Sequence, residues 1–355
     1  MNDSAKSRMD CRKLAYGELH HPLRFSSDQI ERFFPEPLFR ELIAHRRFQR
    51  LKDIRFLGAI DYAVTANGRP LHVRQTRFDH SVGVGLLAQW LADEAGYADS
   101  ERFLLVSSAL LHDIGHGPLS HSLEVVFKEN FSVDHHSTTV AVIRGVSDVT
   151  ESISSVLKRY KVDPEAVIDS LSNLNGEHAL RFLGKFNLDT LEAIPRSASY
   201  LSKQSTSPPP RLVMMAAHFG GPSRRDVLDS FWRQKDFIYQ HLINGAIGVQ
   251  YDRNAQDYMR KNIDAFSADQ FNASEVDLRR RHPLLFSRLG QPRWDTVSIL
   301  SKRFLINKSS EWDDARYLVV KDAATISFEK RPKELLADDL QNNRLFTDDI
   351  QIRRY

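Results

Sequence analysis

The chain has 355 residues, of which 41% are hydrophobic and 27% charged, and its formal net charge is +3. This composition is typical of a folded globular protein and excludes disordered, collagen-like and membrane-spanning classes. Charge this close to balance creates no strong field for nucleic acid, so it identifies no partner. The single cysteine, Cys11, excludes an intrachain disulfide and cysteine-based zinc motifs. Any metal must therefore be held by His and carboxylate side chains.

The sequence carries no sign of membrane insertion or secretion. No run of about 18 apolar residues is present. The first residues, MNDSAKSRMDCRK, lack the apolar core of a signal peptide. We therefore expect a cytoplasmic protein that has no membrane partner.

Helical patterns dominate the first two thirds of the sequence. Capping residues predict a helix that begins near Ser26, and apolar residues three and four apart continue the pattern through 37–57. Asn67 and Gly68 then separate two β-capable runs, which predicts a short hairpin near residues 60–74. Helical periodicity returns at 81–95, 101–116, 121–131, 139–186 and 224–259.

Two segments interrupt this pattern. Three prolines among small polar residues at 203–212 predict an exposed loop, which in a second interpretation borders the site as a lid or an oligomer contact. From Ala315 the tail alternates and contains β-branched residues, which predicts a small strand pair. We expect an all-α fold with a small α/β appendage. The core would occupy residues 1–265, and an oligomeric or regulatory appendage would occupy residues 266–355.

The segment 110–124, LLHDIGHGPLSHSLE, sets polar groups into an otherwise apolar run. His112 and His116 are four residues apart and share a helical face, as do His121 and Glu124, which are three apart. Any one of them is readily explained as a polar group at a helix end that bonds the backbone. Burying the whole group without a cation or substrate would cost roughly 1 to 3 kcal/mol for each unpaired polar group. The cluster therefore indicates a functional site, and its mixed ligands suit Mn, Fe, Co, Ni or Zn.

A resemblance to a known family rests on four residues: His80, the adjacent pair His112 and Asp113, and Asp189 in KFNLDTLEAIPRSASYL. They resemble the ligand set of the HD-domain metal-dependent phosphohydrolases. The wider text, HDIGHGPLSH, TRFDHSVGVG and FQRLKDIRFLG, is similar to one branch, the deoxynucleoside triphosphate triphosphohydrolases. The similarity spans about residues 17–258 and is strongest before Ser122.

The resemblance implies a role for each matching residue. Within residues 77–189, a divalent ion of Mn, Fe, Co, Ni, Zn or Mg would be held by His80, His112, Asp113 and Asp189. Arg77 would contact a phosphate as a forked cation, and Tyr239 would pack against a sugar or ring. The catalytic residues lining the reacting phosphate would be His116, His121, Glu124 and one of His135 or His136, with His135 favoured.

The sequence departs from that branch where a deoxynucleotide would be recognised. After the last ligand, the branch typically carries a basic residue, an aromatic and an acid, and these positions here are Thr190, Ala193 and Ser197. The glutamine expected before Leu-Gly is Phe56. The metal and phosphate residues therefore match, whereas a shorter or different ligand fits better than an ordinary deoxynucleoside triphosphate.

Three functions stay open from the sequence. The leading hypothesis is a metal-dependent phosphohydrolase that acts on a nucleotide or nucleotide-like phosphate ester. The alternative is an HD phosphodiesterase or nuclease that cuts single-stranded nucleic acid or cyclic or oligonucleotide signals, and the third is a nucleotide-sensing module without turnover. The arginine run at 277–283 either faces solvent or binds a regulatory nucleotide or polyanion. Members of the resembling branch form oligomers, so we expect a homo-oligomer.

Overall fold

The computed structural model describes residues 21–64, 68–70, 74–146, 151–173, 175, 178, 181–182, 186–201, 208–221 and 223–291. Helices joined by short turns make up this part of the chain, and no strand occurs in it. Its extended pairings are two isolated antiparallel bridges, Arg55 to Thr76 and Val64 to Pro70. The predicted all-α core is confirmed.

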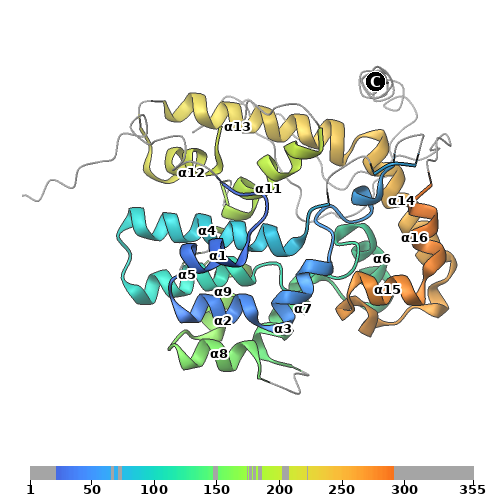
Figure 1. Ribbon diagram of the computed structural model, residues 1–355, viewed down its shortest axis with the longest axis horizontal. Coiled ribbons are helices and arrows are strands. Elements are labelled where there is room, and N and C mark those ends of the chain that lie inside the picture. The colour runs from blue at the N-terminus through green and yellow to red at the C-terminus, as the bar shows by residue number, and fades with distance from the viewer. Residues whose placement is uncertain are drawn as a thin grey trace, which may run out of the picture.

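The centre of the fold is the pair α4 (Arg77–Ala95) and α5 (Asp99–Leu111), which lie side by side (Figure 1). Helices α11, α12 and α13 cover one side of this pair, and α2, α8 and α9 lie on the other (Figure 1). The remaining bounds are α1 (Ser27–Phe33), α2 (Pro37–Ala44), α3 (Arg46–Gln49), α6 (His121–Phe131), α7 (His135–Arg144), α8 (Ile153–Arg159), α9 (Pro164–Ser172), α11 (Leu188–Ala198), α12 (Pro210–Phe219), α13 (Arg224–Ile238), α14 (Ala246–Lys261), α15 (Glu275–Arg281) and α16 (Pro283–Leu289).

Two apolar clusters hold these helices together. The larger one fills the space between α2, α4, α5, α9, α11, α12 and α13. The smaller one joins α6 and the 3-10 turn Gly58–Tyr62 to α14, α15 and α16, with Phe127 and Phe271 in edge-to-face contact at 5.2 Å. Among the described residues, no helix combines the length and the apolar character needed to cross a bilayer.

Capping residues fix the helix ends that carry the candidate site. The Thr76 hydroxyl accepts a hydrogen bond from the Asp79 N–H and begins α4, and Gly96 ends it in the left-handed conformation. Asp134 caps α7 and Asn187 caps α11 in the same way. The first turns of all three helices are therefore fixed by local sequence.

The segment expected to form a hairpin has a mixed local structure. Residues 60–62 belong to the 3-10 turn Gly58–Tyr62, because the Asp61 carboxylate accepts a hydrogen bond from the Leu57 N–H at 2.7 Å and closes the turn. The chain reverses further on, where Val64 and Pro70 form their bridge. Residues 65–67 and 71–73 lie outside the described residues.

Two other expectations concern the second half of the chain. Residues 210–212, expected within an exposed loop, begin α12, because proline suits the first turn of a helix. Residues 268–289 form the 3-10 turn Ala268–Asn272 followed by α15 and α16. The rest of the proline-rich segment at 203–207 and the strand pair expected from Ala315 lie outside the described residues. The division of the chain at residue 265 stays a prediction.

A strained corner separates the two halves of the histidine segment. Leu119 and Ser120 have φ values of 59° and 46°, a region that costs a non-glycine residue on the order of 1 to 3 kcal/mol. The Leu119 N–H donates to the Glu275 carboxylate at 3.2 Å, and the Ser120 hydroxyl donates to the Arg55 carbonyl at 2.6 Å. Surrounding groups thus hold the corner in place.

Helix α14 braces the same corner from the other side. The Ser122 hydroxyl donates to Asp252 at 2.6 Å, and the Gln256 side chain donates to the Ser122 carbonyl at 3.0 Å. The Ala59 N–H donates to the Ser122 hydroxyl oxygen at 2.8 Å. Segments that lie far apart in the sequence therefore meet at the corner.

We expect Gly58→Ala to destabilise the protein far more than Gly68→Ala. Both glycines have φ near 70°, but a Cβ at Gly58 would lie 2.1 Å from the Leu119 carbonyl oxygen, whereas a Cβ at Gly68 meets no atom within 4 Å. The Gly68 variant therefore reports the cost of the backbone conformation alone. Urea unfolding should give an additional loss of about 2 kcal/mol for Gly58→Ala. Equal losses of stability in the two variants would show that the Leu119–Ser120 corner shifts at no cost to accommodate a Cβ at Gly58.

Candidate functional site

The four predicted metal ligands meet where three helices approach one another. His80 lies in the first turns of α4, His112 ends α5 with Asp113 next to it, and Asp189 lies in the first turn of α11. The His80 Nε2 atom is 3.3 Å from His112 Nε2 and 3.1 Å from Asp189 Oδ1. Asp113 Oδ2 is 3.6 Å from His80 Nε2 and 3.5 Å from His112 Nε2. Ligands about 2.1 Å from one ion lie roughly 3 to 3.5 Å apart, so this spacing suits a metal site.

Hydrogen bonds behind the cluster orient both imidazoles. His112 Nδ1 lies 2.8 Å from the Ala109 carbonyl oxygen, which can only accept, so Nδ1 donates to it and Nε2 is the ring nitrogen that faces the cluster. His80 Nδ1 lies 2.5 Å from Glu192 Oε2, which likewise directs Nε2 into the cluster. Two imidazole nitrogens and two carboxylates converge on one point, and a divalent first-row cation fits this donor set.

A buried ion pair that sequence reasoning missed supports His80 from behind. Glu192 and Arg196 both have 0% exposure, and their charged groups lie 2.5 Å apart. His21 Nε2 is 3.2 Å from the same carboxylate, which thus contacts His21, His80 and Arg196. A carboxylate behind a histidine ligand fixes the ring and raises its basicity. The spacing of Asp189, Glu192 and Arg196 along one face of α11 was the available signal.

Even without a metal, the neighbouring side chains favour the ionised form of the Asp113 and Asp189 carboxyls. Burial raises a carboxyl pKa, but the charge of His112 and other cations holds the pKa of Asp113 well below its usual value. His80 holds the pKa of Asp189 low in the same way. Burial lowers the pKa of His80, yet Glu192 and Asp189 raise it overall to about 9. A divalent ion would displace that proton, so metal binding should strengthen as pH rises.

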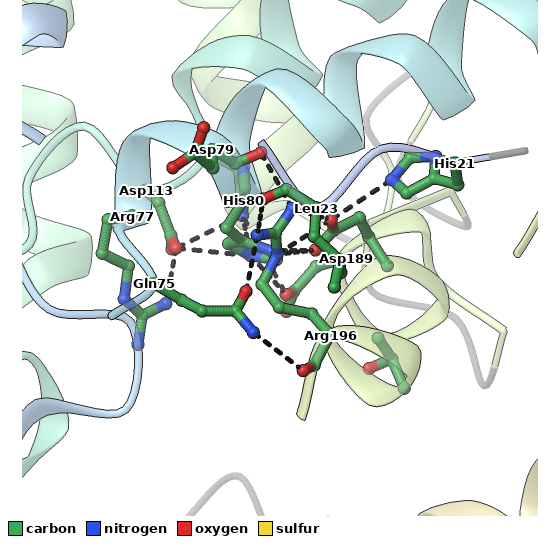
Figure 2. Close-up of polar contacts among 12 residues, drawn as sticks. His21, Leu23, Gln75, Arg77, Asp79, His80, Asp113, Asp189 and Arg196 are labelled. Atoms are coloured by element: carbon green, nitrogen blue, oxygen red, sulfur yellow. Dashed lines mark hydrogen bonds and ion pairs between the residues drawn. The ribbon is translucent and has the colours of Figure 1, made fainter. Parts of the chain in front are cut away.

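Arg77 links the candidate metal ligands to the strained corner. Its guanidinium lies 2.6 Å from Asp113 Oδ2 (Figure 2) and donates to the Ser120 hydroxyl oxygen at 3.0 Å. The guanidinium also lies over the Phe56 ring, 5.2 Å from its centroid. The expected phosphate-contacting arginine is therefore beside the candidate metal ligands, in a fixed orientation.

The residues expected to line the phosphate form a second cluster. His121 Nδ1 lies 2.7 Å from Glu124 Oε2, and His135 Nδ1 bonds the other oxygen of the same carboxylate. The His116 ring stacks on the His135 ring with centroids 4.2 Å apart. The structure thus brings His135 into the cluster, whereas the neighbouring His136 is exposed.

In the second cluster, histidines surround a buried carboxylate that favours its ionised form. Burial raises a carboxyl pKa, but His135 and His121 hold the pKa of Glu124 well below its usual range. Burial lowers the pKa of His121 to about 3. Burial also lowers the pKa of His116, whose Nε2 atom lies 3.3 Å from Asp113 Oδ1. His116 therefore lies between the two clusters, in contact with Asp113 and with the His135 ring.

Both clusters open into one cavity of about 310 Å³. Its wall includes Tyr239, the residue expected to pack against a sugar or ring. The positions where the sequence departs from the triphosphohydrolases also line it, namely Phe56, Thr190, Ala193 and Ser197. The divergent residues therefore border the same space as the candidate metal ligands.

Glu275 of α15 connects the smaller apolar cluster to the site and was not expected from the sequence. Its carboxylate accepts hydrogen bonds from the Arg55 N–H at 2.6 Å, the Tyr62 hydroxyl at 2.6 Å and the Leu119 N–H at 3.2 Å. Burial raises the pKa of Glu275 to about 7, despite these hydrogen bonds. No spacing rule links residues that lie more than 150 positions apart, so sequence reasoning had no signal for it.

The raised pKa of Glu275 predicts a pH-dependent stability. Between its ordinary value of 4.5 and about 7, the folded chain binds a proton that the unfolded chain has lost. Its contribution to stability therefore falls as pH rises through this window, by roughly 3 kcal/mol. We expect Glu275→Gln to gain stability relative to the parent protein between pH 5 and pH 8 in urea unfolding. Glu129→Gln, at an exposed position, is the control, and an identical pH response of both variants would contradict the assignment.

Comparison with known proteins gives a family match for the segment that carries this site. Residues 77–216 match the family model described as the HD domain. The match includes all four candidate metal ligands and the second cluster. The predicted resemblance to the HD-domain family is therefore confirmed over this segment.

Individual relatives agree with this class. The chain is 31% identical to the uncharacterized protein YwfO of Bacillus subtilis over 185 residues. These aligned residues make up 48% of this chain and 40% of that protein. Two relatives are named deoxynucleoside triphosphate triphosphohydrolase SAMHD1. The Bos taurus protein is 31% identical over 228 residues (61% of this chain, 31% of that protein). The Danio rerio protein is 26% identical over 247 residues (65% and 32%). The chain thus spans two fifths or less of the length of these relatives, and its resemblance to the triphosphohydrolase branch is confirmed.

Proposed function

We propose that this protein is a metal-dependent phosphohydrolase. The observation that carries the proposal is the convergence of His80 Nε2, His112 Nε2 and two carboxylates beside Arg77. The HD-domain match and the similarity to the two SAMHD1 proteins, which are named as deoxynucleoside triphosphate triphosphohydrolases, support the same class of reaction. The metal ligands would be His80, His112, Asp113 and Asp189.

The chain's own residues suit phosphate-ester hydrolysis. When bound, a divalent ion supplies Lewis-acid polarisation of a phosphate oxygen and lowers the pKa of a water nucleophile. Arg77 would bind a phosphate oxygen, and His116 and His135 would contact the others. His121, oriented by Glu124, would deliver the proton to the leaving oxygen. A phosphate dianion beside His121 would raise its pKa from the low value set by burial.

The proposed function is tested by a matrix of metals and substrates. The purified protein is stripped with a chelator and reloaded with Mn, Fe, Co, Ni, Zn or Mg. Each form is incubated with p-nitrophenyl phosphate, nucleoside monophosphates, deoxynucleoside and ribonucleoside triphosphates, cyclic dinucleotides and single-stranded oligonucleotides, and products are identified by mass. We expect phosphate-ester cleavage that depends on the added metal. The absence of cleavage of every substrate with every metal would refute the proposal.

Finer expectations belong to the same proposal. A nucleotide or nucleotide-like substrate is supported by the similarity to the SAMHD1 proteins, while the metal identity is left to the matrix of metals and substrates. Homo-oligomerisation and a cytoplasmic location remain proposals that rest on the sequence.

A further inference from the structure

The cavity beside the candidate metal ligands has a polar floor and an apolar wall. The floor is the polar part of the lining and consists of Arg77, His112, Asp113, His121, His135, His136 and Asp189. The wall extends between α7, α9 and α11 and is formed by Val140, Ile143, Ile168, Leu171, Phe182, Ala193, Ile194 and Ile243. A ligand that reaches the floor with a phosphate would therefore place the rest of its structure against hydrocarbon.

The floor offers little positive charge for a polyphosphate. Arg77 is the single Lys or Arg among the described lining residues, and its guanidinium is already bonded to Asp113 at 2.6 Å. With a divalent ion in place, the charges of the ion and of Arg77 would exceed the negative charges of Asp113 and Asp189 by a single positive unit. One phosphate monoester carries about −1.5 to −2 at neutral pH. This charge balance suits one phosphate group, whereas a triphosphate would leave several charges without a partner.

The wall offers few partners for a polar organic group. Its hydrogen-bonding side chains are the short hydroxyls of Ser137, Thr139, Ser172, Thr190 and Ser197, with the Tyr239 phenol at one edge. The Thr139 hydroxyl oxygen already accepts a hydrogen bond from the Gly115 N–H at 3.1 Å. Hydroxyls of a ligand buried without partners would cost roughly 1 to 3 kcal/mol each, so the wall favours an apolar or aromatic group.

We propose that the substrate is an ester of a single phosphate group whose organic part is chiefly apolar or aromatic. This inference rests on the proposed function and names the substrate class of the same cavity. Phosphomonoesters and phosphodiesters of this kind share the chemistry that the cavity recognises. Nucleoside monophosphates would be poorer substrates because of their sugar hydroxyls, and nucleoside triphosphates poorer still because of their charge.

Substrate competition tests the inference. With the most active metal form, kcat/KM is measured for 1-naphthyl phosphate, bis(p-nitrophenyl) phosphate, glycerol 2-phosphate, AMP and dATP. We expect the better of the two aromatic esters to exceed both glycerol 2-phosphate and dATP by at least about tenfold. A preference for dATP or for glycerol 2-phosphate would overturn the inference while leaving the proposed phosphohydrolase activity intact.

A binding measurement separates failure of the inference from failure of the proposed function. Calorimetry compares 1-naphthylmethylphosphonate with a deoxynucleoside triphosphate that carries a non-hydrolysable α,β-imido bridge. Tighter binding of the phosphonate supports the inference even if no ester is hydrolysed, an outcome that would refute the proposed function alone. Tighter binding of the triphosphate analogue would overturn the inference whatever the turnover.

A polar substitution in the wall gives an independent readout. Val140→Thr keeps the side-chain shape and introduces a hydroxyl at a half-buried lining position, and it should raise KM for 1-naphthyl phosphate about five- to tenfold. The KM for methyl phosphate, which is too small to reach the wall, should stay constant. Val146→Thr, at a position with 58% exposure outside the cavity, is the matched control. Equal effects on both substrates would contradict contact between the aromatic group and the wall.

Discussion

Replacing His112 and Asp113 together is expected to remove both bound metal and phosphate-ester hydrolysis. The two side chains supply two of the four groups that converge on one point. The substitution His112→Gln with Asp113→Asn preserves side-chain size, and we expect metal content below about one tenth of the parent level and a loss of kcat of at least a thousandfold. Metal analysis and turnover of p-nitrophenyl phosphate provide the two readouts.

The design of this experiment must separate metal loss from unfolding. Alanine at Asp113 would leave the buried Arg77 guanidinium without its partner, which is expected to cost several kcal/mol, so the amide substitution is preferred. A control with His241→Ala and Asp264→Ala removes the same residue types elsewhere and should keep metal and activity. A folded His112→Gln, Asp113→Asn protein that still binds metal and hydrolyses esters would refute the assigned site.

Removal of the Glu192 carboxylate is expected to have the largest effect on stability. Glu192→Ala leaves the fully buried Arg196 without its ion-pair partner, and breaking a buried pair in this way costs about 3 to 5 kcal/mol. The matched control is Glu165→Ala, which breaks the exposed pair with Arg144 and should have a far smaller effect on stability because solvent screens that pair. Urea unfolding of the two variants compares these costs directly. Similar losses of stability in the two variants would contradict the inference that the buried pair of Glu192 and Arg196 is the more costly one to break.

A gentler change at the same position tests its role in metal binding. Glu192→Gln keeps the side-chain size but weakens the hydrogen bond that orients His80. We expect the affinity for the divalent ion to fall about 10- to 100-fold. Competition with a chelator of known affinity measures this change in the folded variant. An unchanged affinity would show that Glu192 supports the fold alone.

Local patterns in the sequence predicted the helical core, and the resemblance to a known family supplied the grouping of the candidate site residues. The periodicity of α4 and α5 is read from neighbouring positions, because helix formation is largely local. The His112 and Asp113 pair was conspicuous for the same reason. These signals required no knowledge of how distant segments meet.

The parts that escaped prediction depend on distant segments or on competing local bonds. Glu275 contacts Leu119 at the corner from a helix near the end of the described residues, and no periodicity in the sequence predicts such a contact. The 3-10 turn in place of the first expected strand follows from a single bond between Asp61 and the Leu57 N–H. Glu192 could have been found, since it lies three residues after Asp189 on the same helical face, but a carboxylate in a helix is usually a solvated residue.

The contacts that hold the strained corner at Leu119 and Ser120 set a lower limit on the length of chain that can fold by itself. Residues 77–216 match the HD domain, yet the corner between His116 and His121 is held by α14 and by Glu275, which lie outside that match. A fragment cut at the edges of the match would have to carry two left-handed residues without these partners. The segment recognised by similarity and the smallest segment able to hold the clustered histidines in place are therefore different lengths of the same chain.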